Sequence, residues 1–188
     1  MARIPYPDPD DMTPENRDFL SALPQLNISR MLAGSPSLLI PLTRVFSAYL
    51  NDGVLDEKLR ETAILRVGQL CNCEYEIIHH KRVARLIEMD PEKVEAILRG
   101  SPLDKFSEKE RLVLRFVDEQ VLNGGASAET FAAAEQQLST AELIELSTVI
   151  GVYTMVSQIC LSFGIEMEDT PIADTGIRDM KRSIDSLS

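Results

Sequence analysis

The sequence of 188 residues predicts an all-α protein. Apolar residues recur at helical spacing, as in Val113, Phe116 and Val117, with charged residues on the opposite side. No stretch alternates with the period of two that marks a half-buried strand. These patterns predict about eight helices, near residues 14–22, 36–50, 56–70, 74–88, 91–99, 107–123, 127–137 and 139–163.

The first five helices begin at recognisable capping residues or follow closely on a predicted turn. Thr13, Ser35 and Asp90 each precede a proline, and proline suits the first helical position because the N–H it lacks would have no partner there. Asp56 follows an Asn-Asp-Gly turn and predicts the start of the third helix. The fourth helix is expected to start near residue 74, directly after the third.

The last helices carry capping boxes, in which a serine side chain and a glutamate three residues later satisfy each other's backbone N–H groups. Ser107 with Glu110 forms one such pair, and Ser139 with Glu142 forms the other. Gly100 stands where the helix near residues 91–99 is expected to end, because glycine readily adopts the left-handed conformation of a C-terminal cap.

The length and the absence of a clear linker predict one domain over residues 1–188. Within it we expect an extended arm at 1–12, a central region at 36–105, C-terminal helices at 107–165 and a loosely specified tail at 166–188.

The composition is that of a soluble globular protein, with 44% apolar and 26% charged residues. A net charge of −11 argues against nucleic acid and anionic membrane surfaces as partners, because both require a basic surface. No signal peptide is apparent, and three cysteines are an odd number for a disulfide framework. A cytoplasmic location is therefore expected.

One uncharged segment, residues 146–165, is long enough to cross a bilayer. Its Ser, Thr and Gln content and its acidic flanks, without Lys or Arg anchors, favour a different interpretation. We expect a helix buried nearly all round, within the domain or at a contact between copies of the chain.

The segment LCNCEYEIIHH, residues 70–80, concentrates reactive side chains. On a helix that begins near Cys73, the positions of Cys73, Glu76 and His80 fall on one face. Glu61 is an acid in an apolar run of the preceding helix, and it approaches the same face if the two helices pack antiparallel.

The longer segment LRETAILRVGQLCNCEYEIIHH resembles the carboxymuconolactone decarboxylase family, which includes the alkylhydroperoxidase D-like (AhpD-like) proteins. The peroxidase branch has a Glu and, twelve residues later, the first Cys of a C-x-x-C-x-x-x-H motif. Glu61, Cys73 and His80 match three of these positions, and Glu76 replaces the second cysteine. Glu61, Glu76 and His80 also match the decarboxylase branch, which places an acid four residues before the His. The resemblance implies an AhpD-like all-helical fold and a homo-oligomer.

The first functional hypothesis is a lactone decarboxylase-like enzyme that uses acid–base chemistry without a cofactor. Glu76 and His80 would transfer a proton to the substrate carbon, and Glu61 would orient His80. A carboxylated lactone also needs a cation, which Arg60, Arg66 or Arg82 could supply.

The alternative is an AhpD-like thiol peroxidase that reduces a hydroperoxide at Cys73. A helix N-terminus favours the thiolate, and His80 could relay the proton. Two features oppose a dithiol cycle: Glu76 stands where the second cysteine would be, and a Cys71-x-Cys73 pair lies near the upper limit of Cα separation for a disulfide. A one-cysteine enzyme regenerated by an external thiol stays open.

Two further interpretations stand beside these. A zinc site built from Cys71, Cys73, His79 and His80 is disfavoured, because C-x-C and adjacent histidines do not match the usual ligand spacing. A scaffold or ligand-binding protein without catalytic activity remains open. Cys71 and Cys160 are each expected to be a small buried apolar residue, whereas Tyr75 and His79 could either pack or line a pocket.

Overall fold

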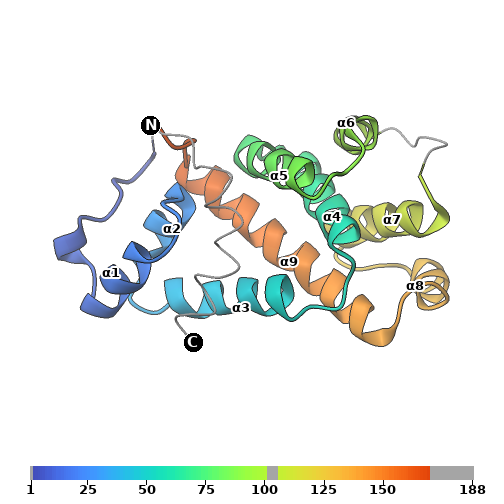
Figure 1. The fold of residues 1–188 in the computed structure, drawn as a ribbon, viewed down its shortest axis with the longest axis horizontal. Coiled ribbons are helices and arrows are strands. Elements are labelled where there is room, and N and C mark those ends of the chain that lie inside the picture. The colour runs from blue at the N-terminus through green and yellow to red at the C-terminus, as the bar shows by residue number, and fades with distance from the viewer. Residues whose placement is uncertain (1, 101–105, 170–188) are drawn as a thin grey trace. The chain divides into compact units, whose positions relative to one another are not determined.

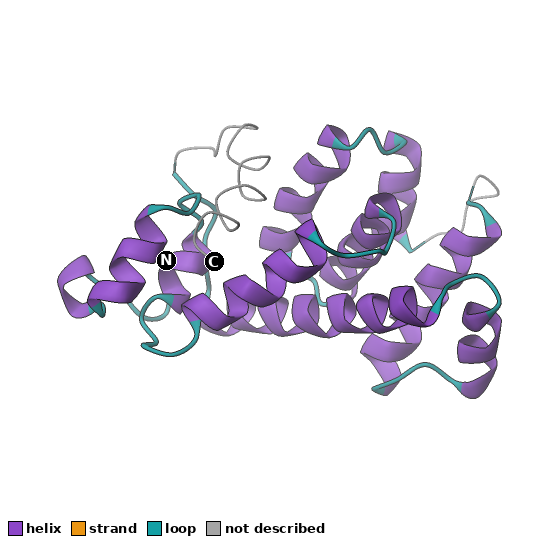
Figure 2. Cartoon of the chain, turned by 60° about the horizontal axis from the view of Figure 1, so that its bottom comes forward, coloured by secondary structure: helices purple, strands orange, loops and turns teal. Residues whose placement is uncertain are grey.

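The computed structural model describes residues 2–100 and 106–169, which contain helices and no strand (Figures 1 and 2). The all-α prediction is therefore confirmed. A short 3-10 turn, Pro9–Asp11, precedes the helices. The α-helices are α1 (Pro14–Ser21), α2 (Asn27–Leu32), α3 (Leu39–Asn51), α4 (Glu57–Leu70), α5 (Glu74–Leu86), α6 (Pro91–Arg99), α7 (Glu108–Asn123), α8 (Ala128–Glu135) and α9 (Thr140–Phe163).

Most of the predicted boundaries agree with the structure. The capping side chains of Thr13, Asp56 and Asp90 accept hydrogen bonds from the first turns of α1, α4 and α6. Ser107 and Glu110 form the predicted capping box. Gly100 ends α6 with a φ of 68°, a left-handed conformation that glycine adopts without steric cost. The predicted tail beyond residue 169 and the segment 101–105 lie outside the described residues.

Two predictions near the N-terminus are wrong. Ser35 does not start a helix, because α3 begins at Leu39 after three turn residues. The Ser35 carbonyl accepts a hydrogen bond of 2.8 Å from Asn16 Nδ2, which ties it to α1 instead. The helix α2 was not predicted. It has six residues, and its N-cap residue, Leu26, has no side chain that could accept a capping hydrogen bond.

The chain divides into two compact units, which we describe separately. The first comprises Met1–Gly53 with Cys160–Ser188, as far as these are described, and the second comprises Val54–Ile159. In the first unit, Arg3 donates from its backbone N–H to the Phe163 carbonyl at 2.7 Å, so the N-terminal arm is attached to the end of α9. Whether both units form one domain, as the sequence predicts, stays a prediction.

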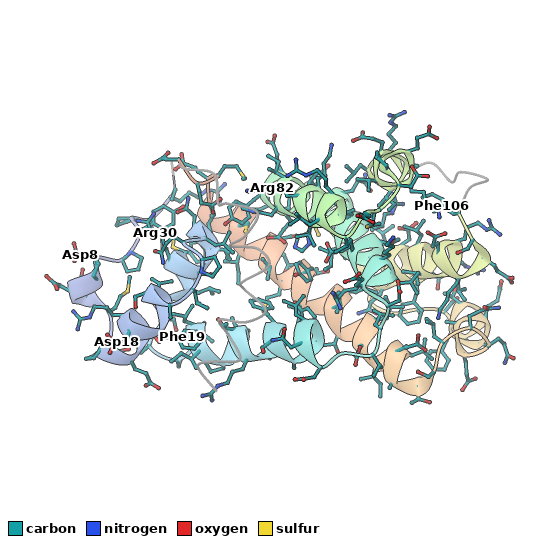
Figure 3. All side chains as sticks on the ribbon, viewed as in Figure 1. Asp8, Asp18, Phe19, Arg30, Arg82 and Phe106 are labelled. Atoms are coloured by element: carbon teal, nitrogen blue, oxygen red, sulfur yellow. The ribbon has the colours of Figure 1, made fainter. Side chains whose placement is uncertain are left out.

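The second unit is organised around α4, which packs against α5, α6 and α7 (Figure 1). Its buried face supplies Leu65 to an apolar cluster with residues of α5, α6 and the segment before α7. Phe106, labelled in Figure 3, belongs to the same cluster, and the Lys93 ammonium lies 5.8 Å from the centroid of its ring. This cluster packs α4 against α5 and α6 around Leu65.

The link from α4 to α5 is a tight turn of three residues. The Asn72 N–H bonds the Gln69 carbonyl at 3.1 Å and the Cys73 N–H bonds the Gly68 carbonyl at 2.9 Å. Asn72 has a φ of 53°. These bonds form a Schellman cap, in which asparagine is the commonest substitute for glycine at the left-handed position. The turn reverses the chain so that α5 runs back along α4.

A glycine sets how closely the two helices approach. A Cβ atom on Gly68 would lie 3.2 Å from Ile77 Cγ1 and 3.5 Å from Glu76 Cβ. The first distance is shorter than an ordinary van der Waals contact, so a side chain here would push the start of α5 away from α4.

The long apolar helix α9 behaves differently from the expectation. It is the one described helix long and apolar enough to span a membrane, a test that core helices also pass, and 39% of its most apolar stretch is buried. Burial nearly all round is therefore wrong for the single chain. Ile144, for example, is 63% exposed. Self-association through this helix stays a prediction.

We predict that Gly68→Ala stabilises the protein less than Gly151→Ala, a matched change in α9. Both remove the entropic penalty of a helical glycine, which is about 1 kcal/mol. A Cβ at Gly151 meets nothing within 4 Å, whereas one at Gly68 must displace Ile77. Urea unfolding of the two variants measures the difference. Equal stabilisation would show that α5 does not press on α4 at this point.

Candidate active site

A buried hydrogen bond joins α4 to α5 at the centre of the site. The His80 Nδ1 atom lies 2.7 Å from Glu61 Oε2. Glu61 is 1% exposed, and His80 exposes 12% of its side chain. A carboxylate so deeply buried is stable only with a hydrogen-bonded or charged partner. Nδ1–H therefore donates to Glu61, which leaves Nε2 to face the rest of the site.

Glu76 lies on the other side of the imidazole. Its Oε2 atom is 3.6 Å from His80 Nε2, one helical turn away on α5. Glu76 is 5% exposed. The imidazole therefore stands between two buried carboxyl groups, one from each helix. The sequence prediction that Glu61 approaches the Glu76–His80 face is confirmed.

Cys73 is the N-cap residue of α5 and is 1% exposed. It lies close enough to Glu76, three residues later, to raise the pKa of that carboxyl group. The position at a helix N-terminus favours a negative charge on the sulfur. The four residues singled out in the sequence, Glu61, Cys73, Glu76 and His80, thus gather where α5 begins and packs on α4.

Burial and neighbouring charges shift the pKa values of Glu76 and His80. Burial raises the pKa of Glu76 to about 7, and the negative charges of Cys73 and Glu61 add to it while His80 opposes it. For His80, burial favours the neutral ring, but the Glu61 and Glu76 carboxylates together outweigh burial and raise the pKa. Glu76 therefore titrates near neutral pH beside an imidazole that keeps its proton more readily than usual, an arrangement suited to proton transfer.

One aromatic residue of the site was not found in the sequence. The Tyr153 ring of α9 meets the His80 ring edge to face, with centroids 4.8 Å apart and planes at 89°. This contact closes the side of the imidazole that faces α9 and holds the ring's orientation. In the sequence, Tyr153 stands in an uncharged and mostly apolar segment, and such a position by itself predicts only core packing.

The three arginines considered as a source of positive charge differ in their burial and contacts. Arg66 donates to Asp118 of α7 through Nε at 2.6 Å and Nη2 at 2.9 Å, so its charge is engaged away from the site. Arg82, labelled on α5 in Figure 3, is only half-buried. Arg60 is 6% exposed, and its charge acts on His80, whose pKa it lowers. Arg60 is thus the cation nearest in effect to the imidazole.

The remaining candidates from the sequence have smaller roles in this geometry. The Tyr75 and His79 rings contact each other with centroids 4.6 Å apart, on the face next to that of His80. Cys71 is half-buried at the C-cap of α4. Within the described residues no group of three or more His, Cys, Asp and Glu side chains is arranged to hold a metal ion.

A separate hollow of about 530 Å³ lies between α7, α8 and α9. Phe116, Gln120, Phe131 and Ser147 are among its lining residues, and none of the four site residues reaches it. Its lining contains no paired acid and base of the kind that Glu61 and His80 form.

The fold belongs to a known structural class. An uncharacterized peroxidase-related protein with an AhpD core, from Ralstonia eutropha JMP134, aligns with a TM-score of 0.76 at 16% identity, covering 89% of this chain and 93% of that one. A peroxidase-related protein from Silicibacter sp. TM1040 gives 0.73 at 17%, covering 89% and 91%. The debrominase Bmp8 gives 0.71 at 16%, covering 91% and 92%. At these identities the likeness shows an AhpD-like fold.

A family model matches the middle of the sequence. The model of the carboxymuconolactone decarboxylase family covers residues 40–119, which include all four site residues. This match and the AhpD-like fold of the similar structures confirm the resemblance predicted from the sequence. No curated protein matches the chain.

We predict that stability falls as the pH rises from about 5 to about 8, and that Glu76→Gln flattens this fall. An unfolded glutamate loses its proton near pH 4.3, whereas folded Glu76 holds it until about 7, so deprotonation favours the unfolded chain in between. The raised pKa of His80 acts in the same direction, because its stabilisation is lost as the pH rises through the folded value.

Urea unfolding at several pH values measures this effect, which for Glu76 amounts to at most about 3 kcal/mol. Glu74→Gln, an exposed position on the same helix, is the matched control and should keep the wild-type profile. A Glu76→Gln profile that parallels the wild type would contradict the buried, protonated state of Glu76.

Proposed function

We propose that the chain is a thiol-dependent enzyme that reduces a small hydroperoxide at Cys73, using Glu76, His80 and Glu61 to move the proton. The observation that carries the proposal is the order of the site: a buried sulfur at a helix N-terminus, then a carboxyl group near its midpoint of titration, then an imidazole fixed by a second acid. No cofactor enters this chemistry.

The burial of Glu76 weakens its electrostatic opposition to a thiolate at Cys73. A carboxylate beside Cys73 would oppose thiolate formation, but burial holds the pKa of Glu76 at about 7. Near neutral pH the group is therefore partly neutral and can either accept or return a proton. In this proposal Glu76 acts as the proton carrier between the sulfur and the imidazole.

The reaction follows from these roles. Cys73 passes its proton toward Glu76 and His80, and the thiolate attacks one oxygen of the hydroperoxide. The S–O bond forms as the O–O bond breaks, and the leaving alkoxide takes the proton back from the relay as an alcohol. Cys73 is oxidised by two electrons to a sulfenic acid, and a thiol reductant returns it to the thiol with release of water.

Named relatives of the fold support a cysteine-centred reaction. Two of the structurally similar proteins are named peroxidase-related. For the debrominase Bmp8, a cysteine-to-alanine variant is known in complex with 2,3,4-tribromopyrrole. Both observations favour a thiol reaction over the lactone decarboxylation that was the first hypothesis from the sequence.

We predict that the protein consumes cumene hydroperoxide in the presence of a thiol reductant and that Cys73→Ser reduces this rate to background. Cys160→Ser is the matched control, since Cys160 is also a buried cysteine outside any disulfide but lies in the other unit. Loss of peroxide is followed by a colorimetric assay over time. Equal rates in Cys73→Ser and wild type would remove the proposed function.

Lactone decarboxylation is the second candidate, favoured by the family match and by one observation. The buried Arg60 places a positive charge where it acts on His80, as a carboxylated substrate would require. In that reaction Glu76 and His80 protonate the substrate carbon and the sulfur has no role. Release of carbon dioxide from a carboxylated lactone that persists in Cys73→Ser would establish this candidate over the peroxidase.

A further inference from the structure

The turn between α4 and α5 brings two cysteines close together. Cys71 is the C-cap of α4, and Cys73 is the N-cap of α5. In an extended link the Cα atoms of such a pair are about 6.6–7 Å apart. That separation is near the upper limit for a disulfide.

The left-handed Asn72 changes this distance. A residue in a helical conformation of either hand brings the Cα atoms on its two sides to about 5.4 Å, as the radius and rise of the helix require. Asn72 has a φ of 53° and is held there by the Schellman hydrogen bonds. Disulfides most often join Cα atoms about 5.5–6 Å apart, so the turn brings the Cα separation of this pair into the range that a disulfide spans.

The surroundings of the two thiols differ in a useful way. Cys73 is 1% exposed and lies beside the proton relay. Cys71 is half-buried and open in part to solvent. Burial raises the pKa of the Cys71 thiol, the nearby Ser157 hydroxyl opposes this, and the charge of Cys73 adds to it. Cys71 therefore rests as a protonated thiol, within electrostatic reach of Cys73, and does not compete with it for an electrophile.

We propose that Cys71 is the resolving cysteine of this enzyme and forms an intramolecular disulfide with Cys73 across the Asn72 turn. This inference rests on the proposed hydroperoxide reduction at Cys73. It assigns to Cys71 the role that Glu76 cannot perform, because a carboxyl group at that position has no sulfur to donate.

Disulfide formation requires one thiol and one sulfenic acid. The Cys71 sulfur attacks the sulfur of Cys73 sulfenic acid, the S–S bond forms, and the S–O bond breaks. The hydroxide leaves with the Cys71 proton as water. A dithiol or two monothiols then reduce the disulfide, and the half-buried Cys71 sulfur is the one that the reductant reaches.

The test treats purified, reduced full-length protein with one equivalent of cumene hydroperoxide, then denatures it and alkylates all free thiols. The chain has three cysteines, so formation of the proposed disulfide leaves one alkylated thiol, Cys160. The tryptic peptide Val67–Lys81 contains both partners. Its mass should be two hydrogens below that of the same peptide with two unmodified thiols. Cys71→Ser should instead yield a sulfenic acid that dimedone traps, and should lose about tenfold in turnovers before inactivation by overoxidation.

The other outcomes separate the two proposals. A wild-type peptide that gains oxygen at Cys73 while Cys71 is still alkylated would overturn the disulfide and leave hydroperoxide reduction standing. A disulfide between two chains, seen as a dimer without reductant, would also overturn it. Three alkylated thiols after peroxide would overturn both proposals. Cys160→Ser serves as control and should form the Val67–Lys81 disulfide as the wild type does.

Discussion

The buried hydrogen bond between Glu61 and His80 is the interaction on which the rest of the site depends. It crosses from α4 to α5 over 2.7 Å, and it involves a carboxyl group with 1% exposure. An acid in that position must be paired, since an isolated buried charge destabilises a fold by several kcal/mol. The pairing requires α5 to lie close against α4, and Gly68 and the Asn72 turn permit this approach.

The electrostatics of the site follow from the same constraint. Because Glu61 fixes Nδ1 of His80, the second nitrogen is directed at Glu76, and burial leaves that carboxyl group partly protonated near neutral pH. Arg60 adds a buried positive charge that limits how far the imidazole retains its own proton. In the proposed function these groups pass a proton to or from the Cys73 sulfur without a large change in net charge. Where the AhpD-like peroxidase pattern has a second cysteine, this chain has Glu76, which we propose as the proton carrier, and it has a further thiol two residues before Cys73, at Cys71.

Much of the fold was predictable because its signals are local. Capping residues such as Asp56 and Asp90, and the helical spacing of apolar residues, set the boundaries of most helices. The helix α2 lacked both signals, and the Ser35-Pro36 pair imitated one while its carbonyl was bonded to Asn16. The grouping of Cys73, Glu76 and His80 was predictable from periodicity alone.

What the sequence could not supply was contact between distant segments. Tyr153 meets His80 only because α9 passes that face, and Arg60 rather than Arg66 acts on the imidazole because Asp118 engages the latter. The closeness of Cys71 to Cys73 depends on a single backbone angle at Asn72, for which a C-x-C pattern carries no information. Degrees of burial, and hence the pKa shifts, are likewise properties of the packed chain.

The most direct measurement is the titration of the histidine ring nitrogens by NMR, since the chain has only two histidines and His79→Gln assigns them. The Glu61–His80 pair predicts that His80 titrates above the ordinary value of about 6.5, with its proton held at Nδ1, and that Glu61→Gln lowers this pKa. A His80 that titrates at the ordinary value in both proteins would contradict the buried ion pair, and with it the relay that the site is built on.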